Sequence, residues 1–211
     1  MIRSLFAAAA LAAAALMSAP ALAQAQAPYV EISPPMPTDA GGKIEVVEFF
    51  WYGCPACYSL EPRLEAWVKQ LPKDVEFKRI PGIFNQQVAI AARVYYVLEA
   101  MGEVERLHRP LFDAIHKQGL KITDDRQLND WLKRQNVDVA KFSAVSKSFS
   151  VESRLKRALE LQSAAKIDGV PSVIVNGRYS VAYGDRMLAV ADGLIEQLRK
   201  QAAPAAASKK K

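Results

Sequence analysis

The sequence has few cysteines and few histidines for its length. Only two of each occur among 211 residues. A small secreted scaffold held together by several disulfides needs more cysteines, so that class is excluded. A structural zinc site needs four ligands, and the two histidines, His108 and His116, lie far from the cysteines in a segment of helical pattern. Zinc is therefore a poor explanation for the cysteine pair, and no metal is predicted.

A strong excess of one charge is also missing. The chain has 28 basic and 22 acidic residues, and three of the basic residues are the terminal lysines 209–211. This balance requires no nucleic-acid partner. About half of the residues are apolar and 24% are charged, which is ordinary globular composition and excludes disorder for the body of the chain.

Long apolar runs are absent except at the N-terminus, where one extends from Leu5 to Met17 after the basic Arg3. This run is shorter than the roughly 20 residues that a transmembrane helix needs. It is followed by Ala21-Leu22-Ala23, which has the pattern of a secretory cleavage site. The sequence predicts a signal peptide over residues 1–23, with an uncleaved anchor as the alternative. The mature protein is then exported to a compartment where disulfides persist.

The remaining pattern predicts an α/β fold that is interrupted by helices. Residues 44–50 and 75–80 have strand composition, and residues 55–70 between them have helical periodicity, which indicates a parallel strand pair. Residues 172–175 and 178–182 are predicted strands around an Asn-Gly turn, followed by a helix over 186–200. The expected domains are one frame formed by residues 28–84 and 167–200, a helical insertion over 85–166 and a disordered tail over 201–211.

Within the helical segment, apolar residues recur at helical spacing, and such stripes are predicted to face the core. They comprise Val88, Ala91, Ala92, Tyr95, Tyr96, Leu107, Leu111, Ala114, Ile115, Leu128, Trp131, Leu132, Leu155, Ala158 and Leu159.

The reactive motif is Cys54-Pro55-Ala56-Cys57, at the point where the first predicted strand ends and a helix begins. A helix N-terminus favours negative charge and lowers a thiol pKa, so Cys54 is predicted to be the exposed, attacking sulfur. Pro55 suits the first helical position, where its missing N–H is not needed. Cys57, one turn further on, is predicted to close a small reversible disulfide with Cys54. The pattern favours redox catalysis, whereas a copper(I) carrier, which also uses two thiolates, remains an alternative.

Three residues before the motif carry further predictions. Glu48 lies within the apolar strand, where its pKa should be raised so that it can exchange protons with Cys57. An edge-strand surface charge is the alternative for Glu48, and it is the expected state of Glu45. Trp51 and Tyr52 are predicted either to border a substrate-binding surface or to pack in the core.

Together, Val47–Phe50, Cys54–Cys57, Gly169–Pro171 and Val175–Gly177 resemble the DsbA family of periplasmic thiol:disulfide oxidoreductases over nearly the whole mature chain. The resemblance implies a thioredoxin fold with an inserted all-helical domain. It implies donation of disulfides to reduced, newly exported proteins and reoxidation by a quinone-linked membrane partner of the DsbB type. No cofactor is expected. No separate dimerisation domain is visible, which favours a monomeric oxidase over an isomerase, although an isomerase or reductase of the same fold remains the alternative.

The resemblance also implies roles for individual residues. Pro171 should follow a cis peptide bond, and the Val170 backbone should hold a substrate strand beside Cys54. Glu48 matches the family's buried acid, and Arg79 is the expected basic companion. One departure concerns the residue before the second cysteine, which is histidine in typical members and Ala56 here. Alanine neither donates to a thiolate nor attracts it by charge, so a milder oxidant is expected.

Overall fold

A five-stranded sheet forms the centre of the computed structural model, which describes residues 27–208. The predicted signal peptide lies outside the described residues. The strand order is β1-β5-β4-β2-β3. The strands are β1 Tyr29–Glu31, β2 Ile44–Phe50, β3 Val75–Pro81, β4 Ser172–Val175 and β5 Tyr179–Val181.

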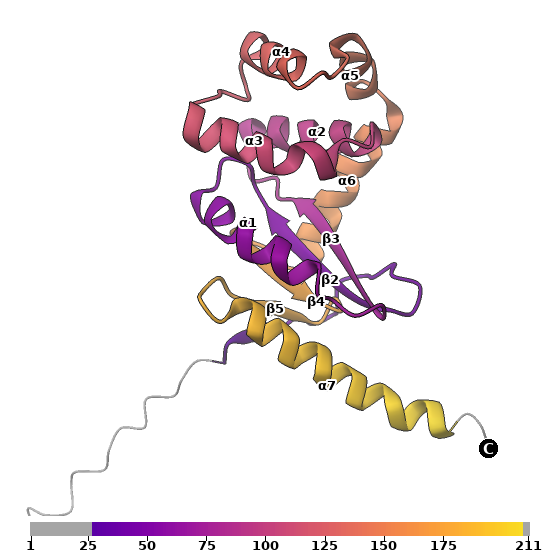
Figure 1. The fold of residues 1–211 in the computed structure, drawn as a ribbon. Helices are drawn as coiled ribbons and strands as arrows, with labels where there is room; N and C mark the ends of the chain where they lie inside the picture. The colour runs from indigo at the N-terminus through magenta and orange to yellow at the C-terminus, as the bar shows by residue number, and fades with distance from the viewer. Residues whose placement is uncertain (1–26, 209–211) are drawn as a thin grey trace, which may run out of the picture.

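Helix α1 connects the parallel strands β2 and β3, as the sequence predicts. Five helices, α2 to α6, fall between β3 and β4, and α7 follows β5. In Figure 1 the helices α2 to α5 gather at one end of the sheet, α6 returns along it, and α7 lies across the opposite end. The helix bounds are α1 Pro55–Val68, α2 Gln86–Ala100, α3 Val104–Gln118, α4 Asp125–Arg134, α5 Val139–Ser146, α6 Phe149–Ala164 and α7 Met187–Ser208.

Two hydrophobic clusters cover the two faces of the sheet. Val46, Val173 and Val175 pack with α1 and α7, whereas Val47 and Phe49 pack with the helices of the insertion. Adjacent residues of β2 thus enter different clusters, as the alternation of side chains along a strand requires. Strand β2 is consequently buried on both faces, which explains its nearly continuous apolar sequence.

The antiparallel pairing of β2 with β4 determines where the Cys54–Cys57 motif lies. Phe49, near the end of β2, pairs with Ser172 at the start of β4. The residues that follow β2 are therefore brought beside the residues that precede β4. This places Cys54 next to the Val170–Pro171 peptide, although the two lie more than a hundred positions apart.

The predicted hairpin between β4 and β5 is confirmed. Asn176 and Gly177 both have positive φ, 51° and 67°, as a tight two-residue hairpin turn requires. A Cβ on Gly177 would lie 2.1 Å from the Met36 carbonyl oxygen, so this close approach needs glycine.

Three expectations about the fold were wrong. Strand β1 pairs with β5 in a segment for which the sequence predicts no strand. Helix α7 continues to Ser208, so residues 201–208 of the predicted disordered tail are helical. Leu159, which was expected in the core, is 47% exposed. The other residues of the predicted stripes are buried or partly buried.

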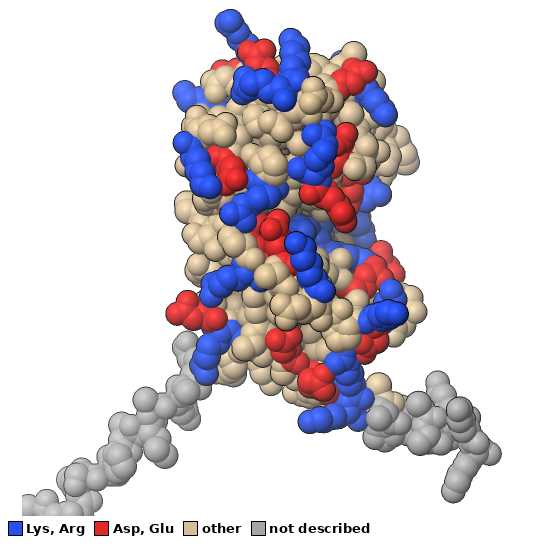
Figure 2. Space-filling view, viewed as in Figure 1, with Lys and Arg blue, Asp and Glu red and all other residues tan. Residues whose placement is uncertain are grey.

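The arrangement is an α/β thioredoxin fold with an all-helical insertion. The boundaries of the two domains stay predictions. Within residues 27–208, no helix combines the length and apolar character needed to cross a bilayer. Figure 2 shows basic and acidic side chains interspersed over the displayed face.

Candidate functional site

Cys54 caps the N-terminus of α1. It has extended backbone geometry, Pro55 occupies the start of the helix, and the Cys57 backbone N–H donates to Cys54 Sγ at 3.2 Å. The local sequence explains this geometry, because proline lacks the N–H that would be unpaired at that position. Both cysteines are free thiols in the structure. The predicted placement of the pair, one sulfur at the helix opening and the other one turn inside, is confirmed.

The two thiols are electrostatically different. Hydrogen bonding from the Cys57 side chain, aided by the Cys57 and Ala56 backbone N–H groups, outweighs burial and lowers the pKa of Cys54 to about 6. The pKa of Cys57 is raised far above the ordinary range, first by its hydrogen bond to Cys54 and then by burial. At pH 7 Cys54 is therefore mostly a thiolate, whereas Cys57 stays protonated.

Cys54 is less exposed than expected. It retains 7% of its surface, whereas Cys57 retains none. The prediction of an exposed attacking sulfur is therefore corrected: Cys54 is the more accessible of two buried sulfurs.

The peptide bond between Val170 and Pro171 is cis, as the resemblance implies. Cys54 Sγ lies 3.4 Å from the Val170 carbonyl oxygen, which accepts a hydrogen bond from the thiol form. Ser172, the next residue, returns its hydroxyl to the Gly169 carbonyl at 2.8 Å. This hydrogen bond within the loop helps to hold the segment that faces the sulfur.

Beneath the cysteines lies a buried cluster of charged side chains. Arg79 Nε donates to Glu48 Oε2 at 3.1 Å, and Arg79 Nη2 donates to Glu61 Oε1 at 2.6 Å. Both carboxyl groups are inaccessible to solvent. The predicted pairing of Glu48 with Arg79 is confirmed, and the alternative of a surface charge at Glu48 is wrong.

The pKa values of the two carboxyl groups in this cluster, Glu48 and Glu61, are shifted in opposite directions. Burial raises the pKa of Glu48 to about 8, although Arg79 opposes this effect. Burial also raises the pKa of Glu61, but the hydrogen bond and charge of His108, together with Arg79, outweigh it and leave this pKa below the ordinary value. Burial itself lowers the pKa of His108, so Arg79 is the cation that Glu61 retains at neutral pH. The cluster then holds one cation, one carboxylate and one protonated acid, Glu48.

Tyr52 belongs to the core and not to the surface. Its ring is 1% exposed, and its hydroxyl lies 2.9 Å from His108 Nδ1. The ring packs edge-on against Phe50 and Phe112. The prediction that Tyr52 borders a substrate surface is therefore wrong, and the alternative of core packing is correct.

Trp51 is partly buried and covers the backbone just before Cys54. A Cβ on Gly53 would lie 2.3 Å from Trp51 Cζ2, so the indole ring rests directly on the glycine backbone. Glycine at this position lets the ring remain within two residues of the helix cap. Trp51 therefore lies beside the segment that carries Cys54, and its contact with a substrate stays a prediction.

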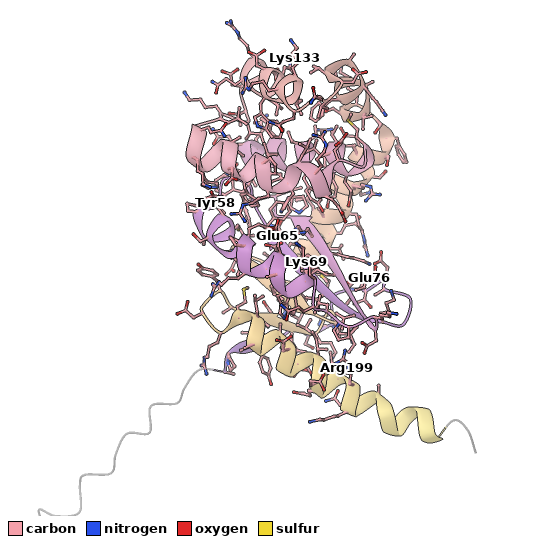
Figure 3. All side chains as sticks on the ribbon, in the orientation of Figure 1. Tyr58, Glu65, Lys69, Glu76, Lys133 and Arg199 are labelled. Atoms are coloured by element: carbon pink, nitrogen blue, oxygen red, sulfur yellow. The ribbon has the colours of Figure 1, made fainter. Side chains whose placement is uncertain are left out.

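Helix α3 of the insertion contacts the loop before Cys54 at one point and helix α1 at another. His116 Nε2 donates to the Tyr52 carbonyl at 2.8 Å, and the Tyr58 hydroxyl donates to Asp113 at 2.6 Å. The Tyr58 and His116 rings are stacked with centroids 4.6 Å apart. Figure 3 shows Tyr58 at the N-terminal end of α1, beneath α3. The insertion thus helps to hold the chain on both sides of Cys54.

The two histidines, which were considered and rejected as metal ligands, have other partners. His108 and His116 are engaged with Tyr52 as described, and the part of the chain from 27 to 208 contains no group of three or more histidine, cysteine, aspartate or glutamate residues placed to hold a metal ion.

Sequence reasoning missed Glu61 and His108 as members of the site and misjudged Glu45. Glu61 lies on the apolar face of α1 beside Leu60 and Leu64. His108 lies beside Leu107 in a predicted apolar stripe. A charged or polar residue within a core-facing stripe was the signal that could have identified both. Glu45, expected at the surface, is 3% exposed, and burial, with Glu76, raises its pKa to about 7.

Comparisons with known proteins agree with this geometry. Residues 75–194 match the family model of the DsbA-like thioredoxin domain. A thiol:disulfide interchange protein DsbA from Bordetella parapertussis is 45% identical over 93% of this chain and 96% of its own. Its counterpart from Azotobacter vinelandii is 42% identical over 81% and 82% of the two chains.

Among solved structures, Pseudomonas aeruginosa DsbA matches with a TM-score of 0.80 and 39% identity, over 83% of this chain and 94% of that one. The Neisseria meningitidis oxidoreductase NmDsbA1 matches with a TM-score of 0.75 and 29% identity, over 84% and 95%. With the helix-capping dithiol already described, these similarities establish that the chain belongs to the DsbA family of thiol:disulfide oxidoreductases.

Proposed function

We propose that the protein is a periplasmic dithiol oxidase that transfers its Cys54–Cys57 disulfide to reduced, newly exported proteins. The difference between the two thiols carries this proposal: one has a pKa near 6, and the other stays protonated throughout the physiological range. A disulfide between such thiols is readily transferred to another protein, because the Cys54 thiolate stabilises the reduced form of the cysteine pair.

The first step is attack by a client thiolate on Cys54 Sγ of the oxidised pair. A sulfur–sulfur bond forms between the client and Cys54, and the Cys54–Cys57 bond breaks, with its electron pair going to Cys57. In the second step another client thiolate attacks the client sulfur of the mixed disulfide. Cys54 leaves as a thiolate, which its low pKa favours. The client is oxidised by two electrons, and the Cys54–Cys57 pair is reduced.

Glu48 supplies the proton that Cys57 takes up in the first step. Its pKa of about 8 keeps it protonated at neutral pH, and its charge is among the influences that raise the pKa of Cys57, so the two groups interact. A protonated carboxyl group donates to the strongly basic Cys57 thiolate, and the resulting carboxylate is stabilised by Arg79. During reoxidation the proton returns in the opposite direction.

The Val170 backbone and Pro171 form the side of the site on which a client strand lies. The Val170 carbonyl faces Cys54 Sγ, and its hydrogen-bonding capacity is free for a client N–H when Cys54 is in a disulfide. A membrane quinone reductase of the DsbB type then reoxidises the pair. It approaches the same sulfur and leaves the protein ready for another client.

The test combines two measurements on the purified protein. The Cys54–Cys57 couple is equilibrated with glutathione, and the oxidised protein is mixed with reduced, unfolded ribonuclease A. We expect stoichiometric loss of ribonuclease thiols and a couple more oxidising than glutathione. Unchanged ribonuclease thiols in the presence of oxidised protein would refute the proposal. If the protein instead rearranges scrambled ribonuclease faster than it oxidises reduced ribonuclease, the isomerase or reductase alternative is favoured.

Replacing Ala56 with histidine should make the protein a stronger oxidant. An imidazolium beside the helix cap attracts the Cys54 thiolate and lowers its pKa further. Each unit of pKa corresponds to about 1.4 kcal/mol, or roughly 30 mV for this two-electron couple. The ultraviolet absorbance of the thiolate and the glutathione equilibrium measure the two effects, with Ala56→Gln as the uncharged control. An unchanged potential in Ala56→His would contradict the expectation.

Replacing Trp51 with alanine should slow oxidation of a protein more than oxidation of a small dithiol. The indole covers the chain beside Cys54 and offers apolar surface to an unfolded client. We expect kcat/KM for reduced ribonuclease to fall by about fivefold, in the range of a modest apolar contact. Equal slowing with dithiothreitol would assign Trp51 to packing alone.

A further inference from the structure

Three exposed apolar side chains lie on α2, on α6 and in the loop between β3 and α2. Among residues 27–208, six large apolar residues are substantially exposed, and three of these are Phe84, Ile90 and Leu159, at 40%, 38% and 47%. Leu159 is the residue that helical periodicity assigned to the core. An isolated exposed apolar residue needs no explanation, but a group of them indicates an interaction surface.

Ile90 of α2 and Leu159 of α6 both line a groove between these helices. The groove has a volume of about 450 Å³, and its apolar wall also includes Ile83 and Leu155. Arg93 and Glu152 also line the groove, and Arg93 donates to Glu152 at 2.6 Å. The groove therefore has the size and lining to accept an apolar side chain, with charged groups at its margin.

Three apolar residues, Val170, Phe84 and Ile83, lie between Cys54 and this groove, and we call them the apolar strip. A Cβ on Gly82 would lie 2.9 Å from the Phe84 ring and 3.3 Å from Val170 Cγ1, so both side chains pack on the same glycine. The carbonyl of Val170 is the group that contacts Cys54. From Phe84 the chain passes directly to Ile83, which lines the groove.

The strip is also firmly held in place. The Ile83 N–H donates to Gln162 Oε1 at 2.7 Å, and Gln162 Nε2 donates to the Ile83 carbonyl at 3.3 Å. This pair of hydrogen bonds attaches the loop after β3 to α6. These hydrogen bonds restrain the loop that carries Ile83 and Phe84 relative to α6, which lines the groove.

We propose that the α2–α6 groove binds an apolar side chain of the client polypeptide at a defined sequence separation from the cysteine that reacts with Cys54. This inference rests on the proposed oxidase function and adds a substrate preference to it. An unfolded client supplies both an extended chain and exposed apolar side chains. A second copy of this protein is a poorer occupant, because a folded chain seated on the strip would cover the sulfur that turnover requires.

The test uses reduced dithiol peptides of glycine and serine that carry one leucine at increasing separation from the cysteine pair. We expect kcat/KM to be greatest at one separation, by about tenfold over the leucine-free peptide, which is the range for one apolar side chain in a pocket. In an Ile90→Ser/Leu159→Ser variant the ratio of leucine-containing to leucine-free kcat/KM should fall to about one. A Val30→Ser/Phe149→Ser variant, which removes exposed apolar residues elsewhere, should retain the ratio.

The experiment distinguishes failure of the groove inference from failure of the proposed oxidase function. No dependence on leucine position, or a ratio that survives in the groove variant, would overturn the inference and leave the oxidase function intact. Failure of the unaltered protein to oxidise the leucine-free peptide would instead refute the proposed function. A dimer of the unaltered protein in sedimentation, lost in the groove variant, would show that a second copy occupies the groove and would overturn the inference as well.

Discussion

Iodoacetamide at pH 7 should alkylate Cys54 of the reduced protein more than a hundredfold faster than Cys57. With a pKa of about 6, Cys54 is about 90% thiolate at this pH, whereas an ordinary thiol is about 1% thiolate. Cys57 has a pKa far above the ordinary value and no exposed surface, so its protonation and its burial both slow its alkylation. Peptide mapping of the alkylated protein identifies the reacting residue, and the rate should be half-maximal near pH 6.

Stability provides an independent measurement of the same ionisation. The folded-state pKa of Cys54 lies below its ordinary value of 9.0, so the folded reduced protein releases a proton that the unfolded chain keeps between about pH 6 and 9. Stabilisation by the thiolate is complete above pH 9 and is lost as the pH falls through 6. Relative to the oxidised protein, the reduced protein should gain at most about 1.4 kcal/mol per pH unit across this window. Equal pH dependence of the two forms, or equally slow alkylation of both thiols, would show that Cys54 is not held as an anion.

Replacing Arg79 with methionine should destabilise the protein by about 3–5 kcal/mol at pH 7, the usual cost of removing one partner from a buried ion pair. Arg79 is the single cation between Glu48 and Glu61, and both carboxyl groups are completely buried. Without Arg79 their pKa values rise, so the folded protein binds protons that the unfolded chain has released. The deficit should therefore grow as the pH rises and shrink as the carboxyl groups are protonated in acid. Urea unfolding across this pH range measures it.

Two variants serve as controls for Arg79→Met. Arg178→Met removes an exposed arginine that pairs with Glu31, and should cost less than about 1 kcal/mol. Adding Glu61→Gln to Arg79→Met removes the uncompensated carboxylate and should recover a substantial part of the loss. If Arg79→Met costs no more than Arg178→Met, the cluster does not hold a buried charge.

Local features of the site were predictable because they depend on neighbours in sequence. The strand before Cys54, the proline at the start of α1 and the Asn-Gly hairpin follow from residue type and spacing alone. The pairing of Glu48 with Arg79 needed the resemblance, because it depends on the register between β2 and β3. That register places the two residues opposite each other in the sheet.

Burial was predicted less well, because it depends on which element covers a side chain. Tyr52 is inaccessible because α3 packs over it through His108 and Phe112, and no local pattern reports that contact. Leu159 shows the converse error: its spacing on α6 matches the core stripe, yet the neighbouring helix leaves it at the rim of a groove. Glu61 and His108 were missed for the same reason, because Glu61 on α1 and His108 on α3 become site residues only when the two helices pack together.

The hydrogen bonds from α3 to the loop before Cys54 and to helix α1 imply that the helical insertion is not a detachable accessory. Tyr52, Tyr58 and Glu61 belong to the thioredoxin frame, but their partners His108, Asp113 and His116 belong to the insertion. A minimal protein made by excising the insertion would leave these polar groups without partners, and a chimera with an insertion from a distant relative would need compensating exchanges on α1. The helical insertion and the surroundings of the dithiol are therefore coupled, and a redesign of one part has to include the other.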